Sequence, residues 1–360
     1  MGKSIYKAAV VGLSGIGARR GQSPEDMPSY RPMPRSHLSA YFDHTQVQVV
    51  GVCDLSHKAL ESCKENWSPD LPHLNYYTDY REMLTAERPD IVSVATPDHL
   101  HTKITIDAIN SGVRAIWCEK PIATTLADCD IMIEAAEKAH VLLTVNHSRR
   151  WSGIYLYARQ LLRSQEFGAL KSIVCHFYEP RSMLFRNGTH MIDAICFFAE
   201  AEPVWVWGEL QTGFEAYLEY RGDGRNPATD PSATAYIKFS NGVRAYYNSE
   251  KTHTVLGNFF ELICETGRVI VSDDNCQIVQ NAGIRSQGGR GLALTYAEVP
   301  QYVAQWELGA VSELIHVLEN NGELVSPAGE ARKTLRIMLG ILKSQQLSNC
   351  PVSLNSTAAL

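Results

Sequence analysis

Two kinds of sequence pattern alternate over the first 147 residues, and this alternation limits the fold more than any other feature of the chain. Short, almost continuously apolar runs are typical of parallel strands covered on both faces; they are Lys7–Leu13, Val47–Cys53, Ile91–Ala95, Val113–Cys118 and Val141–Val145. Helical patterns lie between them, among them Lys58–Asn66, Leu100–Ser111 and Leu126–Lys138. Strands alternating with helices indicate βαβ units. We therefore predict a doubly wound α/β domain over residues 1–147.

The pattern changes after Trp151, and residues 148–360 are predicted to form a second, α+β domain. A helical stretch, Ile154–Gln165, precedes longer strand-like runs, which are Ser172–Tyr178, Val204–Leu210, Ala233–Phe239, Val243–Ser249, Phe259–Glu265 and Arg268–Val271. The turn sequence Ser240–Gly242 between two of these runs predicts a hairpin and a mostly antiparallel sheet. Two helices, Trp306–Asn320 and Gly329–Gln346, are expected near the end of the sequence, where they can pack back on the first domain.

Bulk properties exclude several classes of protein. The net charge of −6 gives no electrostatic footprint for nucleic acid. The nine cysteines are scattered and never spaced CxxC, which favours reduced thiols in a cytoplasmic protein over disulfides or a metal site. No apolar stretch reaches membrane-spanning length and the start of the sequence lacks a signal-peptide core, so no membrane partner is expected.

A glycine-rich turn follows the first predicted strand and opens a helix, which is the context of a dinucleotide-binding fingerprint. Gly12 would make the tight turn and Gly17 would let helix and strand pack closely. Ser14 stands where the middle glycine is usual, with Gly15 and Ile16 after it. A glycine turn without a ligand remains the alternative.

Asp54 ends the second strand, where NAD enzymes place the carboxylate that binds the ribose hydroxyls. It lies 37 residues beyond Gly17, whereas the usual interval is about 20. Leaving out the 17 residues Arg20–Ser36 restores the interval, so we infer a proline-rich insertion, Gly21–Arg35, near the first turn of the first helix. The acid favours NAD over NADP, although Arg19 or Arg20 could bind a 2′-phosphate.

Two further segments follow predicted strands. Lys120, in Glu119-Lys120-Pro121, would point into the crevice at the carboxyl ends of the strands, where such sheets bind ligands. Thr96 and Pro97 occupy the same position one strand earlier and lead to His101. The alternatives are a solvated loop lysine and a proline that only starts a helix.

Taken in order, these segments resemble the glucose-fructose oxidoreductase / inositol dehydrogenase / rhizopine-catabolism (Gfo/Idh/MocA) family of NAD(P)-dependent oxidoreductases. Glu119-Lys120-Pro121 is similar to its EKP signature, Thr96–His101 to its TPxxxH segment, and His37 to the histidine that follows its glycine turn. The resemblance implies a Rossmann domain joined to an α+β domain with a large, open, mostly antiparallel sheet. It also implies NAD as cofactor, a sugar or cyclitol substrate, and a homodimer or homotetramer paired through that sheet.

The resemblance also implies site residues. In the family, a histidine like His190 faces the EKP lysine and takes the hydroxyl proton, Lys120 binds the same oxygen, and Asp193 can orient the imidazole. Thr96, Pro97 and His101 complete the residues that are expected to bind the cofactor. Glu119 stands beside Lys120 at the same site and is expected to have a mainly structural role. Arg150 and Trp151 could contact substrate or cofactor, or form an interdomain salt bridge and a core tryptophan. Tyr178 is expected in the cleft from its position alone.

One departure bears on the substrate. Many relatives have an aspartate four residues before this histidine, where this chain has Arg186, followed by Asn187. Either no carboxylate is needed there, or the substrate is anionic or differently oriented, or the chemistry is not simple alcohol oxidation.

The leading hypothesis is an NAD-dependent dehydrogenase of a sugar, cyclitol or sugar derivative. The alternatives are an NAD-dependent glycoside hydrolase or lyase that oxidises its substrate transiently, and a non-catalytic NAD-binding regulator.

Overall fold

The structure is a computed structural model that describes residues 4–20, 36–222, 226–252, 257–284, 290–300 and 305–355. The chain divides into two compact units. The first comprises Met1–Trp151, Arg221–Asp223 and Val303–Arg332, and the second comprises Ser152–Tyr220, Gly224–Tyr302 and Lys333–Leu360.

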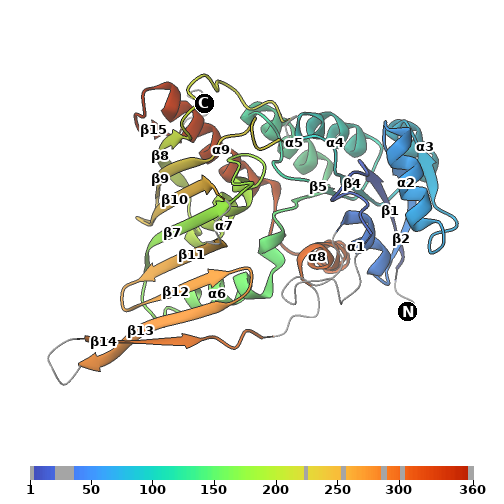
Figure 1. The fold of residues 1–360 in the computed structure, drawn as a ribbon. Helices are drawn as coiled ribbons and strands as arrows, with labels where there is room; N and C mark the ends of the chain where they lie inside the picture. The colour runs from blue at the N-terminus through green and yellow to red at the C-terminus, as the bar shows by residue number, and fades with distance from the viewer. Residues whose placement is uncertain are drawn as a thin grey trace. The chain divides into compact units, whose positions relative to one another are not determined.

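The first unit is built on a six-stranded parallel sheet in the order β3-β2-β1-β4-β5-β6, of which Figure 1 labels β2, β1, β4 and β5. The strands are β1 (Tyr6–Val11), β2 (Val47–Cys53), β3 (Asn75–Tyr77), β4 (Ile91–Val94), β5 (Ala115–Cys118) and β6 (Leu142–Val145). β1, β4 and β5 are buried at nearly every position, because helices cover both faces of the sheet. This strand order reverses direction between β1 and β4, where doubly wound sheets open a ligand crevice.

Helices α4 and α5 lie on one side of this sheet and α1 and α8 on the other (Figure 1). The helices are α1 (His37–Asp43), α2 (His57–Trp67), α3 (Tyr80–Glu87), α4 (His101–Asn110), α5 (Leu126–Ala139) and α8 (Trp306–Asn320). Four begin at a side-chain cap that accepts a backbone N–H, and the caps are Ser36, Ser56, Asp79 and Thr125. Leu314 and Ile315 of α8 belong to the same apolar core as Trp117 of β5.

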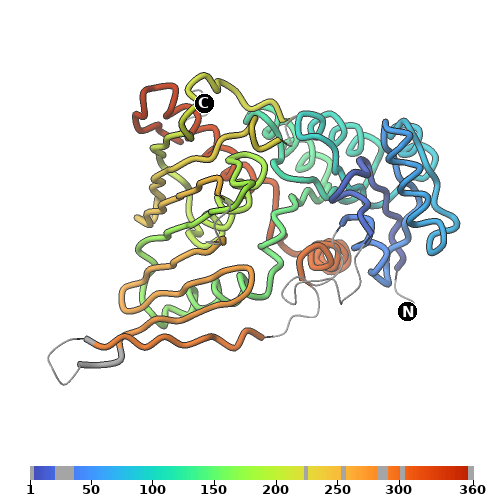
Figure 2. The backbone as a smooth tube through the Cα atoms, in the orientation of Figure 1, coloured from blue at the N-terminus to red at the C-terminus, as the bar shows by residue number. Residues whose placement is uncertain are grey.

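The second unit contains a nine-stranded sheet in the order β14-β13-β12-β11-β7-β10-β9-β8-β15. The strands are β7 (Leu170–Glu179), β8 (Pro203–Leu210), β9 (Ala233–Phe239), β10 (Arg244–Lys251), β11 (Gly257–Cys264), β12 (Gly267–Ser272), β13 (Cys276–Ile284), β14 (Arg290–Tyr296) and β15 (Val352–Ser353). Neighbouring strands are antiparallel except for β7 and β10. The β11–β12 hairpin can be followed in Figure 2.

One face of this sheet packs against helices and the other carries partly exposed side chains. The helices are α6 (Gly153–Arg163), α7 (Gly188–Ala199) and α9 (Ala328–Gln346). Along β10, for example, Tyr247 is fully buried whereas its neighbour Tyr246 is 40% exposed, because successive strand residues point to opposite faces. The sheet therefore has a buried inner face and an open outer face.

The predicted fold class is confirmed: a parallel α/β sheet with covering helices, and a large, mostly antiparallel second sheet. The Ser240–Gly242 hairpin is present, since β9 pairs with β10 in antiparallel register and Gly242 has φ +89°. The sequence patterns missed β3, α3, β13 and β14. The three residues of β3 are too few to show a period, and the described part of β14 exposes Leu292, Leu294 and Tyr296, so its pattern does not match burial.

Candidate NAD-binding and catalytic site

The glycine turn after β1 leaves no room for side chains at two of its positions. Gly12 has φ +93°, and a Cβ there would lie 2.5 Å from the carbonyl oxygen of Ala95. A Cβ at Gly17 would lie 1.9 Å from the carbonyl oxygen of Gly12. Gly15, with φ +60°, has nothing within 4 Å of its would-be Cβ. The first and last glycines are thus required by close packing, and the middle one leaves the turn open on one side.

Hydrogen bonds join the turn before the predicted insertion to the start of α1 after it. The N–H of His37 donates to the carbonyl of Ile16 at 2.9 Å, and that of Leu38 to Gly17 at 3.0 Å. If the 17 residues Arg20–Ser36 are left out of the count, both are ordinary bonds from residue i to i−4. Ser36 also donates its hydroxyl to the carbonyl of Arg19. The two ends of the insertion therefore lie together in the first helical turn, while Gly21–Arg35 itself falls outside the described residues.

Asp54 lies beside the turn and supports it. One of its carboxylate oxygens accepts the backbone N–H of Leu13 at 2.8 Å, and the other accepts that of Ser56 at 2.8 Å. A cavity of about 590 Å³ opens next to the turn. Its lining comes from the turn and from α2, and includes Ser14, Gly15, Arg19, Arg20, Ser56, Lys58 and Asn66.

Arg20 is already engaged within the unit. Its guanidinium forms an ion pair with Asp70 and lies 5.0 Å from the centre of the Trp67 ring. The same group donates to the backbone carbonyl of Asn66. These contacts hold the guanidinium against α2 and the turn that follows it.

The residues around the turn fit a dinucleotide. Gly12 and Gly17 bring backbone close to backbone, as a pyrophosphate-binding turn requires. The hydroxyl of Thr96, next to Gly12, is buried and has no hydrogen-bond partner among the described residues. A buried hydroxyl in this state costs free energy unless a ligand group pairs with it. Pro97, which follows, is exposed at the same strand end.

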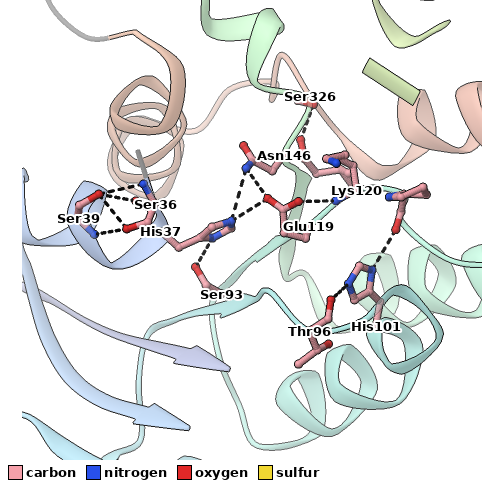
Figure 3. Close-up of polar contacts among 12 residues, drawn as sticks. Ser36, His37, Ser39, Ser93, Thr96, His101, Glu119, Lys120, Asn146 and Ser326 are labelled. Atoms are coloured by element: carbon pink, nitrogen blue, oxygen red, sulfur yellow. Dashed lines mark hydrogen bonds and ion pairs between the residues drawn. The ribbon is translucent and has the colours of Figure 1, made fainter. Parts of the chain in front are cut away.

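The corner that carries Lys120 is held by a buried polar network (Figure 3). Glu119 is 6% exposed, and its carboxylate accepts from Asn146 at 2.5 Å and contacts Nε2 of His37 at 3.1 Å. Its second oxygen accepts the backbone N–H of Lys120 at 3.3 Å. On the other side of the imidazole, Nδ1 of His37 lies 2.8 Å from the hydroxyl of Ser93. The network joins α1, β4 and the segments after β5 and β6.

Glu119 stays ionised in this network. Burial by itself would raise the pKa of its carboxyl, but the hydrogen bond with His37, the charge of Lys120 and the hydrogen bond from Asn146 outweigh burial and lower the pKa to about 2. Glu119 is therefore an anion placed directly before the proposed catalytic lysine.

His101 is also buried, with no exposed surface. Its Nδ1 lies 3.0 Å from the carbonyl oxygen of Pro121, and its Nε2 lies 3.0 Å from that of Thr96. The peptide bond between Lys120 and Pro121 is cis. The imidazole thus binds backbone on both sides of the crevice edge, so His101 could serve a cofactor only through Thr96 and Pro121.

In the second unit, α7 begins at Gly188 and carries His190 and Asp193. A Cβ at Gly188 would lie 2.5 Å from the hydroxyl of Tyr247, so this helix start packs closely on the inner face of the sheet. His190 is partly exposed, whereas Asp193 is 1% exposed and accepts from the hydroxyl of Thr334 at 3.3 Å. Asp193 is thereby tied to α9.

The two residues before α7 are fixed through neighbouring segments. The backbone N–H of Arg186 donates to Asp230 at 2.9 Å, and the amide of Asn187 donates to the carbonyl of Arg181 at 3.0 Å. Asp230 is 3% exposed and also accepts from the backbone N–H of Phe185. A carboxylate therefore does stand close to Arg186, but it binds backbone.

The structure does not bring Tyr178 together with His190. Tyr178 follows Phe177 on β7, and Phe177 is buried on the inner face against which α7 packs. The hydroxyl of Tyr178 accepts from Asn248 at 2.6 Å, and its ring stacks near His176. Because side chains alternate along a strand, Tyr178 belongs to the open outer face.

Arg150 and Trp151 are structural parts of the first unit. Arg150 is 2% exposed, donates to the carbonyl of Val325 at 2.9 Å and pairs with Glu330 at 3.3 Å. Trp151 is 4% exposed and donates to Glu313 of α8 at 3.1 Å. These contacts account for both side chains without a ligand.

Sequence reasoning missed most of the network behind Lys120. His37 drew attention only through its place after the glycine turn, and Ser93 and Asn146 were given no role. A polar signal was present, since Ser93 interrupts the apolar run Ile91–Ala95 and Asn146 directly follows a strand. Their convergence on Glu119 depends on the order of the strands, which the sequence patterns do not specify.

Two family models match the chain. One is described as the oxidoreductase family, NAD-binding Rossmann fold, and matches residues 6–147. The other is described as the GFO/IDH/MocA C-terminal domain and matches residues 155–270. Together they cover most of the chain.

Curated relatives match part of it. A D-apiose dehydrogenase from Paraburkholderia graminis is 34% identical over 134 residues, which is 37% of this chain and 34% of that protein. An inositol 2-dehydrogenase from Salmonella typhimurium is 26% identical over 123 residues, which is 34% of this chain and 35% of that protein. The aligned region thus spans about a third of the length of each.

Solved structures match over the full length. An oxidoreductase from Agrobacterium radiobacter, solved in complex with NAD+, L-tartaric acid and magnesium, has a TM-score of 0.76, is 16% identical, and covers 99% of this chain and 100% of its own. At this identity the likeness shows the fold. No helix in the part of the chain that the structure describes is long and apolar enough to cross a membrane.

Proposed function

Because the chain belongs to the GFO/IDH/MocA family of NAD-binding oxidoreductases, we propose that it is an NAD-dependent dehydrogenase acting on a secondary hydroxyl of a sugar, cyclitol or sugar derivative. The observation that carries the proposal is the corner at Glu119-Lys120-Pro121. A buried, ionised carboxylate fixes the backbone of Lys120 at the carboxyl end of β5, beside a glycine turn that fits a dinucleotide.

In this proposal, residues of the chain bind the substrate and the cofactor and accept the hydroxyl proton. Lys120 donates a hydrogen bond to the substrate oxygen and stabilises the negative charge that develops on it. His190 accepts the hydroxyl proton, and Asp193, held by Thr334, helps to keep α7 in place. Arg186 and Asn187 contact the substrate. When bound, NAD supplies the acceptor for the hydride. Asp54, Ser14, Gly15 and Ile16 hold the cofactor together with Thr96 and Pro97.

The alternative keeps the same residues and changes the outcome. An NAD-dependent glycoside hydrolase or lyase would oxidise its substrate transiently and return the hydride, with no net reduction. A non-catalytic NAD-binding regulator is a third possibility, and the presence of both Lys120 and His190 argues against it.

We propose a homodimer or homotetramer that buries the open outer face of the second sheet. We also propose a cytoplasmic location, because all nine cysteines are free and eight of them are buried as thiols in the two cores.

One experiment separates the three functions. The protein is incubated with NAD and a panel of cyclitols, hexoses, glycosides and sugar acids, the acids being included because of Arg186. Net formation of reduced cofactor supports the dehydrogenase. Release of a sugar without net reduction supports the hydrolase or lyase, and cofactor binding without turnover supports the regulator.

The role of His190 is tested in the same assay. His190→Ala should lower kcat by roughly 10²–10⁴-fold, which is the usual value of a general base, and leave NAD affinity nearly unchanged. His73→Ala is the matched control, since His73 is exposed in the first unit. Near-normal turnover by His190→Ala would show that another group takes the proton.

A further inference from the structure

The surroundings of His101 specify its protonation state. Nδ1 lies 3.0 Å from the carbonyl oxygen of Pro121 and 3.3 Å from that of Ile122, and Nε2 lies 3.0 Å from that of Thr96. Backbone carbonyl oxygens can only accept hydrogen bonds. Both ring nitrogens of His101 therefore face acceptors.

A neutral imidazole cannot satisfy this arrangement. It carries one N–H and one lone pair, so either tautomer would set a nitrogen lone pair against a carbonyl oxygen at 3.0 Å, in a site without water contact. The Cys118 sulfur beside the ring also acts as an acceptor, since its hydrogen bond favours the protonated imidazole. Only the doubly protonated ring donates to both carbonyls.

The bonds of this ring join two strand ends. Thr96 follows β4, and Pro121 follows Lys120 after β5, so both acceptors lie at the carboxyl edge where the sheet binds ligands (Figure 3). We propose that His101 is a positioning residue: a permanently charged imidazolium that fastens the chain after β4 to the chain after β5 and thereby fixes Lys120 for the reaction. The last part of this proposal rests on the proposed function.

The charged groups around His101 agree with this reading. Burial by itself would lower the pKa of its imidazole, but interactions with the Cys118 sulfur, the nearby Asp98 and the Thr96 carbonyl outweigh burial and raise the pKa to about 10. A group whose pKa is raised on folding stabilises the folded state below its unfolded pKa. For His101 this stabilisation is complete below about pH 6.5 and is lost as the pH rises towards about 10.

Nitrogen-15 NMR of the histidine side chains tests the charge directly, on the intact wild-type protein. We expect one imidazole to keep protons on both nitrogens from about pH 6 to about pH 9, well above the ordinary titration of histidine. This signal should disappear in His101→Gln and remain in His73→Gln, the matched control on an exposed histidine. A wild-type His101 with one unprotonated nitrogen at about pH 8 would overturn the proposal.

The pH dependence of unfolding gives a second measurement. Between about pH 7 and about pH 9, the unfolding equilibrium constant of the wild type should rise about tenfold per pH unit relative to His101→Gln, because only the folded wild type holds the extra proton. If the ratio of the two unfolding equilibrium constants, wild type to His101→Gln, stays constant over this pH range, His101 is not charged in the folded protein. If His101→Gln does not fold, the wild-type spectra still decide the question.

The positioning role is tested separately, once a substrate is known. His101→Gln should lower kcat at least tenfold while the Kd for NAD changes little. Unchanged turnover would overturn the positioning role. The NMR and unfolding measurements use no sugar, so they can fail or succeed independently of the proposed function.

Discussion

Two carboxylates that follow strands of the same parallel sheet have different surroundings. Asp54 after β2 is partly exposed and accepts two backbone N–H groups, one of them from the glycine turn. Glu119 after β5 is buried and accepts from His37, Asn146 and the backbone of Lys120. Asp54 is therefore accessible to a ligand, whereas the hydrogen bonds of Glu119 are all made within the protein.

Asp54 should select NAD over NADP. Its charge repels a 2′-phosphate, and Arg20, the nearby cation that could attract one, is paired with Asp70. Asp54→Asn should reduce the preference for NAD by about tenfold or more, as measured by titration of both cofactors. Equal or tighter NADP binding by the wild type would contradict this assignment and direct attention to Arg19.

Glu119 should make stability depend on acid pH. Its pKa is lowered from 4.5 to about 2 on folding, so its stabilising effect is complete above about pH 4.5 and is lost as the pH falls towards about 2. Near neutral pH, Glu119→Gln should lower the free energy of unfolding by roughly 3 kcal/mol at most. The difference in unfolding free energy between the variant and the wild type should become smaller as the pH falls. Urea unfolding of both proteins at several pH values measures this difference in free energy. Glu65→Gln, on the exposed face of α2, is the control, and a pH-independent gap for Glu119→Gln would refute the account.

At the level of elements, the first helix shows how a long insertion leaves a motif intact. The hydrogen bonds from His37 and Leu38 to Ile16 and Gly17 join the start of α1 to the glycine turn, and the hydroxyl of Ser36 donates to the carbonyl of Arg19. Chain can therefore be added at this point without moving the glycine turn.

Replacing Gly21–Arg35 by a short glycine linker should preserve folding and NAD binding, because its two ends already lie together. Substrate use should weaken, since the described residues at both ends of the segment, Arg20 and Ser36, lie beside the cofactor turn. Cofactor titration and steady-state kinetics measure the two effects. Unchanged substrate kinetics would show that the segment is a tolerated surface insertion.

The elements that could be predicted are those whose pattern is set locally. The buried runs of β1, β2 and β4 and the periodicity of α5 and α8 follow from the sequence, as does the resemblance carried by Glu119-Lys120-Pro121. The network around Glu119 could not be predicted, because it joins α1, β4 and β6 through strand order. The faces of β7 could not be assigned either: Tyr178 was expected in the cleft from its position alone, whereas its hydroxyl accepts from Asn248 of the neighbouring strand β10.

At the scale of the whole molecule, the outer face of the second sheet lacks a covering layer among the described residues. Partly exposed aromatic rings contact one another across its strands: Trp205 lies 5.1 Å from Tyr236, and Tyr236 lies 5.2 Å from Tyr246. An apolar face of this kind is typical of an interface.

Light scattering at micromolar concentration should therefore give a mass of two or four chains. Tyr246→Glu, which places a charge in the middle of this face, should shift the mass towards a monomer. Leu218→Glu is the matched control, because Leu218 is 68% exposed and lies outside the sheet. A monomeric wild type would refute self-association through this face.

The central claim is that this protein moves a hydride from a substrate carbon to the nicotinamide. It is tested most directly by incubating the protein and NAD with a panel of sugars and cyclitols that carry deuterium on carbon, and then measuring the mass of the reduced cofactor. The account predicts deuterium in the reduced cofactor with at least one compound, whether or not net reduction accumulates, and its loss in Lys120→Ala. Tight NAD binding without deuterium transfer from any compound in the panel would contradict it.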